Sequence, residues 1–216
     1  MFESTRAQRF NMVKELADEM LVNLYKKGSS QAFRVLYLRH QQKVYHFVLR
    51  FFNNKEIAEE LFQESFLRIF SNIHKYSPAL KFTTWMYSIV RNLCIDEYRK
   101  KKVRKVISLE DHLKKHFTHD LPDTSSKPVD VNLIHKERSY YVKQAIEKLP
   151  HDQKEILILR ETEDISFQEI SEILGESVNT VKSRMRYALV NLRKSLQEMG
   201  VFESLIYKES LHNEVF

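Results

Sequence analysis

The stretch SFQEISEILGESVNTVKSRMRYALVNLRKSL, residues 166–196, has the pattern of two helices joined by a short turn. Ser166 is a preferred helix N-cap, and Glu169, three positions later, completes a capping-box pattern. Gly175 can adopt the left-handed backbone that ends a helix, and Ser177 is a suitable cap for the next one. The sequence therefore predicts a helix-turn-helix, with helices over residues 166–174 and 177–198.

The second of these helices has an apolar face and a basic face. At about 100° per residue, five apolar side chains fall within a narrow arc and are predicted to be buried. They are Val178, Val181, Met185, Leu189 and Leu192. Residues 177–196 also contain five basic residues and no acidic one. A solvated basic face is common in helical proteins, but the capping box, the glycine turn and the lack of acids together favour a DNA-binding helix.

The side-chain types on the basic face suit DNA. Arg, Lys, Asn and Ser bind base edges and phosphates, and the first turns of the second helix reach the bases in such motifs. We therefore expect Lys182, Ser183 and Arg186 to lie at or near the bases. Contacts to the DNA backbone are expected from Thr180, Arg184, Tyr187 and Arg193.

Composition agrees with a helical, polyanion-binding protein. Only 3 Gly and 4 Pro occur in 216 residues, which argues against the many tight turns of an all-β fold. The formal net charge is +6, which favours an anionic partner. The single cysteine, Cys94, cannot form an intramolecular disulfide and is expected to be an inert core thiol. Without a leader-like or membrane-spanning run, we expect a soluble cytoplasmic protein.

Apolar residues recur at helical spacing along most of the chain. The predicted helices cover residues 12–26, 31–52, 56–76, 82–102, 136–149 and 151–161, ahead of the helix-turn-helix. Between residues 107 and 131 the helical periodicity fades, two prolines occur, and there are five acidic and three basic residues. We therefore predict an all-α fold of two small helical domains joined by a flexible linker.

The helix predicted over residues 82–102 mixes aromatic and basic side chains, and six of the seven residues from 99 to 105 are basic. Bases of single-stranded nucleic acid stack on aromatic rings while cations neutralise their phosphates. Phe82 could serve the core or a ligand equally well, whereas Trp85 at helical spacing from Ile89 is more typical of a core residue.

Three stretches together resemble the extracytoplasmic-function type of bacterial RNA polymerase sigma factor, group IV of the sigma-70 superfamily. EELFQESFLRIF, residues 59–70, is similar to the helix that binds core polymerase. FTTWMYSIVRN, residues 82–92, followed by DEYR, residues 96–99, resembles the −10-element helix. VNTVKSR, residues 178–184, resembles the −35 recognition helix. The three occur in the family's order, and no segment resembles the larger middle domain of housekeeping sigma factors.

The resemblance implies a domain plan. Residues 12–102 would form sigma region 2, which binds core polymerase and the −10 element, and residues 136–198 would form sigma region 4, which binds the −35 element. Residues 103–135 would be the linker, with an N-terminal extension at 1–11 and a C-terminal tail at 199–216. The implied function is an alternative sigma factor that directs promoter-specific initiation and assists DNA melting.

The resemblance also implies partners and site residues. The partners are core RNA polymerase, through its β′ coiled coil and β flap, promoter DNA and an anti-sigma factor. The residues implied for core polymerase are Glu60, Gln63 and Glu64. Those implied for the −10 element are Lys81, Phe82, Trp85, Arg91, Asn92, Asp96 and Arg99, with the loop 75–81 receiving a flipped base. Those implied for the −35 element are Asn179, Thr180, Lys182, Ser183, Arg184, Arg186 and Tyr187.

Two other functions fit parts of the sequence. A free-standing helix-turn-helix regulator would share the DNA-binding helix, but it would need a dimer to read paired half-sites and has no need of the acidic 59–64 face. A metalloenzyme could use His112, His116 and His119. It would lack a carboxylate motif, and the neighbouring lysines would repel a cation. We therefore expect no catalytic residues, metal or cofactor.

Overall fold

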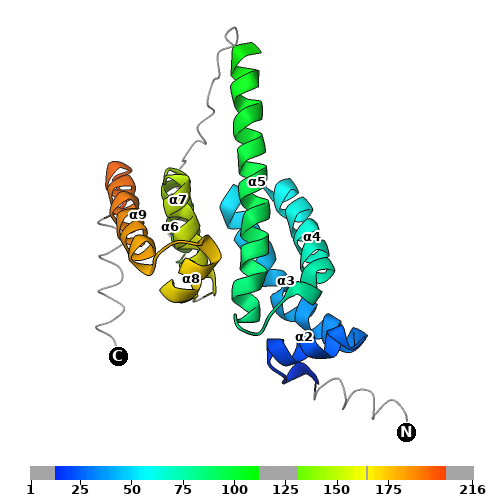
Figure 1. The fold of residues 1–216 in the computed structure, drawn as a ribbon. Helices are drawn as coiled ribbons and strands as arrows, with labels where there is room; N and C mark the ends of the chain where they lie inside the picture. The colour runs from blue at the N-terminus through cyan, green and yellow to red at the C-terminus, as the bar shows by residue number, and fades with distance from the viewer. Residues whose placement is uncertain (1–12, 112–130, 164, 203–216) are drawn as a thin grey trace, which may run out of the picture. The chain divides into compact units, whose positions relative to one another are not determined.

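A computed structural model describes residues 13–111, 131–163 and 165–202, and all regular secondary structure in those ranges is helical (Figure 1). The helices are α2 (Asp18–Lys26), α3 (Ser30–Phe52), α4 (Lys55–Asn72), the 3₁₀ turn η1 (Ile73–Lys75), α5 (Phe82–Asp111), α6 (Val131–Glu147), α7 (His151–Glu163), α8 (Phe167–Leu174) and α9 (Val178–Glu198). The all-α prediction is confirmed. Contacts divide the chain into two compact units, residues 1–102 with 158–178 and residues 103–157 with 179–216.

The breaks between α2, α3 and α4 follow from local sequence. Gly28 has a φ of 92°, a left-handed conformation that glycine adopts without steric cost. The Ser29 side chain then caps α3 by accepting a hydrogen bond from the amide of Ala32 at 3.3 Å. Asn53 ends α3 with a φ of 49°, and Asn54 caps α4 through the amide of Ile57 at 2.9 Å. The predicted interruptions at 28–30 and 53–54 are confirmed.

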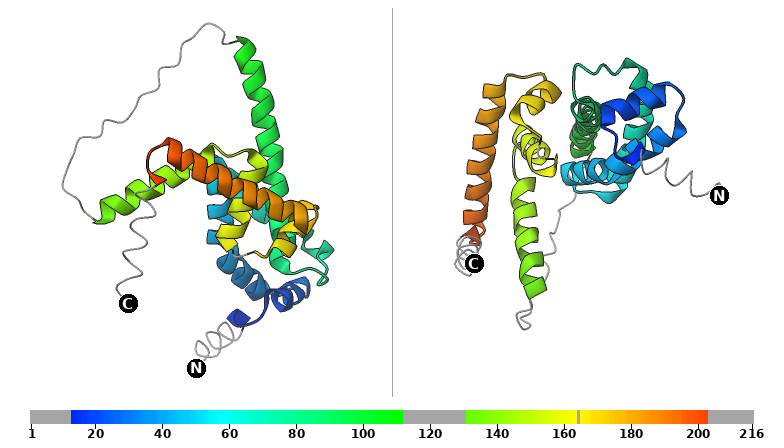
Figure 2. Two further views of the ribbon diagram at one scale, coloured as in Figure 1. Left: turned by 90° about the vertical axis from the view of Figure 1, so that its left-hand side faces the viewer. Right: turned by 90° about the horizontal axis from the view of Figure 1, so that it is seen from below.

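The core of this segment is aromatic and aliphatic. α3 packs against both α2 and α4, and the rings of Phe47 on α3 and Tyr87 on α5 have centroids 5.4 Å apart (Figures 1 and 2). Both rings are buried, as are Ile69 and Val90. Cys94 is fully buried, as expected of a core thiol. This packing fixes the outer faces of α4 and α5.

The first predicted helix is only partly correct. It was expected from residue 12, but residues 15–17 form a break and α2 begins at Asp18. The physical reason is a side chain from α3: the guanidinium of Arg39 donates hydrogen bonds to the backbone oxygens of Lys14 and Leu16, at 2.7 and 3.0 Å. Those carbonyls are thereby held in a turn rather than in a continuous helix.

α5 and α6 extend into the predicted linker. α5 continues to Asp111 rather than ending near Lys102, and α6 begins at Val131 rather than at Lys136. Residues 103–111 contain no Pro or Gly, so nothing in them terminates the helix that precedes them. The third helix also ends earlier than predicted, at Asn72, and is followed by the 3₁₀ turn.

Polar contacts join α7 to its neighbours in the chain. Lys154, which is largely buried, pairs with Glu147 on α6 at 2.7 Å. Gln153 accepts a hydrogen bond from the amide nitrogen of Asn191 on α9 at 2.7 Å. α9 is thus tied to the start of α7 by a side-chain contact across 38 residues of sequence.

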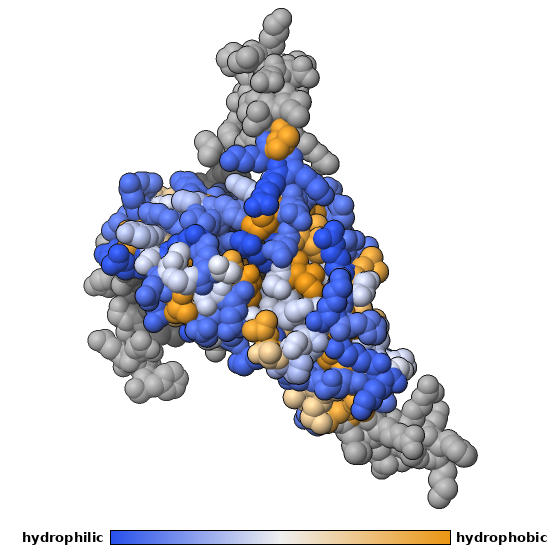
Figure 3. All heavy atoms as spheres, in the orientation of Figure 1, coloured by the Kyte–Doolittle hydropathy of each residue, from blue (hydrophilic) through white to orange (hydrophobic). Residues whose placement is uncertain are grey.

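On the face drawn in Figure 3, hydrophilic residues dominate, and hydrophobic residues form small separate patches. Among the described helices, none is both long and apolar enough to cross a bilayer.

Candidate nucleic-acid interface

The turn that precedes α9 is built as predicted. The Ser166 hydroxyl accepts a hydrogen bond from the amide of Glu169 at 3.2 Å, and the Glu169 carboxylate accepts one from the amide of Ser166 at 2.9 Å. Gly175 ends α8 with a φ of 67°, and the amide of Glu176 donates to the carbonyl of Ser171 at 3.0 Å. These contacts fix where α8 stops and where α9 starts.

α9 presents the polar face that the sequence indicates. Val181, Met185 and Ala188 are buried, whereas most of the residues proposed for the −35 element are exposed. The exposed ones are Asn179, Thr180, Lys182, Ser183, Arg186 and Tyr187. The guanidinium carbon of Arg186 lies 5.2 Å from the centre of the Tyr187 ring. This stacking positions a cation and an aromatic edge together on the exposed face.

Four side chains of α9 differ from the prediction: Val178 and Leu192 are only partly buried, and Leu189 and Arg184 differ more. Leu189 was expected to be buried but is 49% exposed, because the buried stripe passes through Ala188 and Leu196 instead. Arg184 was assigned to the DNA backbone, yet it is only partly exposed and its Nε lies 3.8 Å from a carboxylate oxygen of Asp152 on α7. Arg184 is therefore anchored within the protein as well as close to the basic face.

The predicted −10 residues lie on α5 and, for Lys81, in the loop before it, and they divide into exposed and buried side chains. Lys81, Asn92, Asp96 and Arg99 are exposed, while Trp85 and Arg91 are partly exposed. One guanidinium nitrogen of Arg91 lies 3.5 Å from the side-chain oxygen of Asn92. α5 therefore carries charged and amide groups along one exposed side, where they can bind a polar ligand.

Phe82 is the exception among these residues. It is only 1% exposed and lies between the rings of Tyr76 and Trp85, with centroid distances of 5.7 and 5.9 Å. The ring of His40 packs on it as well, at 5.6 Å. A ring enclosed in this way has no free face for a base in this structure, and its contact with the Trp85 ring supports that side chain.

The loop between η1 and α5 has five exposed residues, from Ser77 to Lys81, flanked by the buried rings of Tyr76 and Phe82. The Tyr76 hydroxyl donates to the carbonyl of Leu80 at 2.7 Å, which closes the loop on itself. Burial, helped by the nearby carboxylates of Glu19 and Asp18, raises the pKa of Tyr76 to about 12. The phenol therefore stays protonated, and able to donate, at neutral pH.

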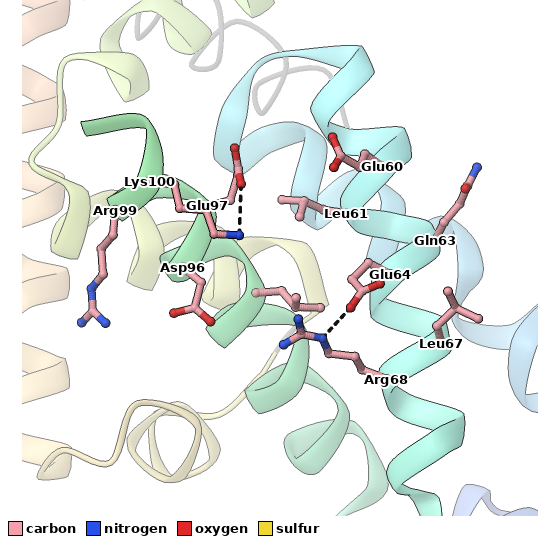
Figure 4. Close-up of a pocket in the computed structure, with 11 residues that line it drawn as sticks. Glu60, Leu61, Gln63, Glu64, Leu67, Arg68, Asp96, Glu97, Arg99 and Lys100 are labelled. Carbon is pink, nitrogen blue, oxygen red and sulfur yellow. Dashed lines mark hydrogen bonds and ion pairs between the residues drawn. The ribbon is translucent and has the colours of Figure 1, made fainter. Parts of the chain in front are cut away.

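The acidic face of α4 is exposed, as predicted. Glu60 and Gln63 are exposed, and the partly exposed Glu64 pairs through its carboxylate with Arg68 at 2.6 Å (Figure 4). Sequence reasoning missed Arg68 as a partner of this face, although a Glu and an Arg four residues apart on a helix are a recognisable pair. Leu67, beside them, is 65% exposed, so the face combines acids with an apolar side chain.

A groove of about 630 Å³ runs between α4 and α5 (Figure 4). On the α4 side it is lined by the acidic face and Arg68, and on the α5 side by Asp96, Arg99 and Lys100. The structure thus brings the residues predicted to bind polymerase close to two of those predicted to bind the −10 element. The three histidines of the alternative metal site lie outside the described residues. Among the residues that the structure does describe, no cluster of metal-ligating side chains occurs.

Comparison with known families agrees with both domains. The family model for sigma-70 region 2 matches residues 36–104, and the model for sigma-70 region 4 matches residues 139–192. Together these matches cover more than half of the chain. The two helical domains predicted from the sequence are therefore confirmed as regions 2 and 4.

Characterised relatives align along nearly the whole chain. An ECF RNA polymerase sigma factor of Bacillus subtilis, SigW, is 32% identical over 86% of this chain and 100% of its own length. The sigma-H factor of Pseudomonas aeruginosa is 28% identical over 87% of this chain and 98% of its own.

Two solved structures share the fold. One is CnrH in complex with the cytosolic domain of CnrY, with a TM-score of 0.62, 20% identity, and coverage of 85% of this chain and 99% of that one. The other is the sigma factor RpoE of Bartonella quintana in complex with the anti-sigma factor NepR, with a TM-score of 0.56, 19% identity, and coverage of 76% and 96%. With both domain models and a full-length relative in agreement, this chain belongs to the extracytoplasmic-function RNA polymerase sigma factors of the sigma-70 family.

Proposed function

We propose that this sigma factor binds core polymerase and recognises the promoter −35 element through two exposed surfaces of opposite charge. The acidic face of α4, with Glu60, Gln63 and Glu64, docks on the basic β′ coiled coil of core RNA polymerase. Opposite charges favour encounter and register there. The observation that carries the proposal is the coexistence of this exposed acidic face with the basic face of α9, which has no acid from residue 178 to residue 196, in one chain of this family.

Promoter reading is assigned to α9 and α5. Lys182, Ser183 and Arg186 contact or approach the bases of the −35 element, and neighbouring α9 side chains hold the DNA backbone. On α5, Asn92, Asp96 and Arg99 contact the −10 element. Of the loop predicted over residues 75–81, the exposed part, 77–81, takes up a base flipped out of the opened strand. Flipping costs a few kcal/mol, which contacts inside a pocket must offset.

The initiation experiment uses purified chain and core polymerase on genomic DNA, followed by mapping of RNA 5′ ends. The expected result is a small set of defined start sites that core polymerase alone does not use, sharing two sequence elements upstream. Binding of promoter fragments by the chain, without any association with core polymerase, would instead support a free-standing regulator. The relatives that align along 86% and 87% of this chain favour the sigma factor.

An anti-sigma factor is proposed as a further partner. Both solved structures of similar fold were determined with a bound protein, and one of these is named as an anti-sigma factor. The exposed face of α4 and the basic face of α9 are the surfaces that such a partner would have to cover. Since the partner polymerase is cytoplasmic, we place the protein in the cytoplasm.

A further inference from the structure

Two side chains of α2 form hydrogen bonds with backbone groups at the two ends of the loop 77–81, which lies more than 50 residues later in the sequence. The ammonium of Lys26 donates a hydrogen bond to the backbone oxygen of Tyr76 at 2.9 Å, across 50 residues of sequence. The carboxylate of Glu19 accepts one from the backbone amide of Phe82 at 3.1 Å, across 63 residues. The five exposed loop residues therefore begin and end at backbone groups held by α2.

The spacing of these two side chains matches the geometry of a helix. Glu19 and Lys26 are seven residues apart, close to two full turns, so they lie on the same face of α2. The Phe82 amide is one of the first amides of α5, which have no partner within the helix and need an acceptor from outside. Glu19 supplies that acceptor and so fixes where the loop ends and α5 begins.

α2 is itself held in place on α3. The carboxylate of Asp18 accepts a hydrogen bond from Arg39 at 2.5 Å and lies 2.8 Å from Nε2 of His40. Burial opposes ionisation of Asp18, but these hydrogen bonds and charges outweigh it and lower the pKa of the carboxyl. The ring of His40 in turn packs on Phe82. A connected set of contacts thus runs from α3 through α2 to both ends of the loop.

The interior of the loop is fixed by the same region. Tyr76 is 5% exposed, its hydroxyl holds the carbonyl of Leu80, and its ring lies 5.7 Å from the Lys26 ammonium. The Trp85 ring packs against Tyr76 at 5.4 Å and remains partly exposed next to the loop. Leu80 itself is 40% exposed. The loop therefore offers an open apolar and aromatic surface on a backbone that is held at both ends.

We infer that Glu19 and Lys26 are positioning residues for −10 recognition: they hold the loop 77–81 in the shape that receives the flipped base. This inference rests on the proposed function of the loop. Neither side chain needs to touch DNA, because each acts through a backbone group at a loop end. A preorganised loop loses less entropy on binding than one that must be ordered by the base.

The test measures how much one base contributes to binding. Holoenzyme, formed from core polymerase and the full chain, is titrated with the single-stranded −10 sequence of a mapped promoter and with copies that carry one abasic site each. For the parent protein, one abasic position should weaken binding by about tenfold, the equivalent of one or two hydrogen bonds. If the parent binds all the oligonucleotides equally, the loop does not capture a base, and the proposed function of the loop falls together with this inference.

The variants test the inference separately from that function. The abasic ratio is the Kd for the oligonucleotide with the abasic site divided by the Kd for the intact one. Lys26→Met and Glu19→Ala should bring this ratio close to one, while affinity for core polymerase stays at the parent value. Lys26→Arg and Glu19→Gln keep a donor and an acceptor and should restore the ratio. Lys27→Met, at the exposed neighbouring position, is the matched control and should leave it unchanged. A parental ratio in both Lys26→Met and Glu19→Ala overturns the inference.

Hydrogen exchange distinguishes a local effect of the substitution at the loop from general misfolding of the protein. In Glu19→Ala, the amide of Phe82 should exchange faster than in the parent, while the amides of α3 keep their protection. Loss of protection throughout α3 together with a lost abasic ratio would show that Glu19 acts through global stability, and would also overturn the positioning role.

Discussion

The segment from α2 to α5 and the segment from α8 to α9 carry functional surfaces that are held in different ways. Around α8, the devices are local: Ser166 and Glu169 cap one another three residues apart, and Gly175 ends the helix. Around α5, the devices are distant: Glu19 reaches Phe82 across 63 residues, and Lys26 reaches Tyr76 across 50. A helix-turn-helix needs only a correct angle between consecutive helices, whereas an exposed loop needs support from the rest of its domain.

The comparison predicts that damage to a distant contact costs more than damage to a local one. Asp18→Ala should show the largest effect on stability, about 2–3 kcal/mol, because Arg39 and the buried His40 lose the carboxylate between them. The measurement is urea unfolding at pH 7, followed by fluorescence of Trp85, the single tryptophan. Glu15→Ala, at an exposed position in the preceding turn, is the control. A loss no greater than that of Glu15→Ala would remove Asp18 from the support of the loop.

The same contact predicts a pH dependence. The pKa of Asp18 is lower in the folded protein than the ordinary 3.8, so its ionised form stabilises the fold above about pH 4. That stabilisation is lost as the pH falls through the folded value. The difference in unfolding free energy between the parent and Asp18→Asn should therefore be present at pH 7 and shrink steadily below pH 4. A difference that grows on acidification would contradict the assignment.

On the DNA-binding side, Arg186→Ala should weaken −35 binding by roughly 1–3 kcal/mol and relax selectivity at one position. The reason is the exposed guanidinium in the early turns of α9, stacked on Tyr187. The measurement is holoenzyme binding to promoters with each −35 base replaced in turn. Lys194→Ala, near the end of α9 and away from those turns, serves as the control. An unchanged preference at every base would exclude Arg186 from recognition.

The smallest effect is expected from the local cap. Ser166→Ala removes the hydroxyl that accepts from the Glu169 amide and should cost about 1 kcal/mol, confined to α8. Hydrogen exchange of the α8 amides measures this directly. Ser183→Ala, exposed in the interior of α9, should be neutral or slightly stabilising because Ala favours helix interiors. Equal losses for the two serine variants would mean that the cap contributes nothing beyond helix propensity.

These same differences explain what the sequence could predict. The capping box, the turn at Gly175 and the breaks at Gly28 and Asn53 depend on residues a few positions apart, so their patterns are legible along the chain. The break before Asp18 was missed because its cause, Arg39, lies on another helix. The extension of α5 to Asp111 was also missed, although residues 103–111 contain no Pro or Gly that would end the helix.

The site residues follow the same rule. Exposure of the acidic face of α4 and of Lys182, Ser183 and Arg186 on α9 follows from helical periodicity alone. Burial of Phe82 does not, since it depends on the rings of His40, Tyr76 and Trp85 around it. Exposure of Leu189 depends on the neighbouring small residue, Ala188, occupying the buried stripe. Helical periodicity predicts which face of a helix is buried, but the side chains that pack on that face determine which residues at its border are buried and which are exposed.

The separation of docking from recognition is the central claim, and transcription at increasing concentrations of the chain tests it most directly. On a mapped promoter, Glu64→Lys should need a much higher concentration than the parent, then reach the same start site and the same final yield, because only docking is weakened. Arg186→Ala should bind core polymerase at the parental concentration yet keep a lower yield at saturation on that promoter. Parental behaviour of Glu64→Lys at low concentration, or a shifted start site at saturation, would contradict the division of labour between α4 and α9.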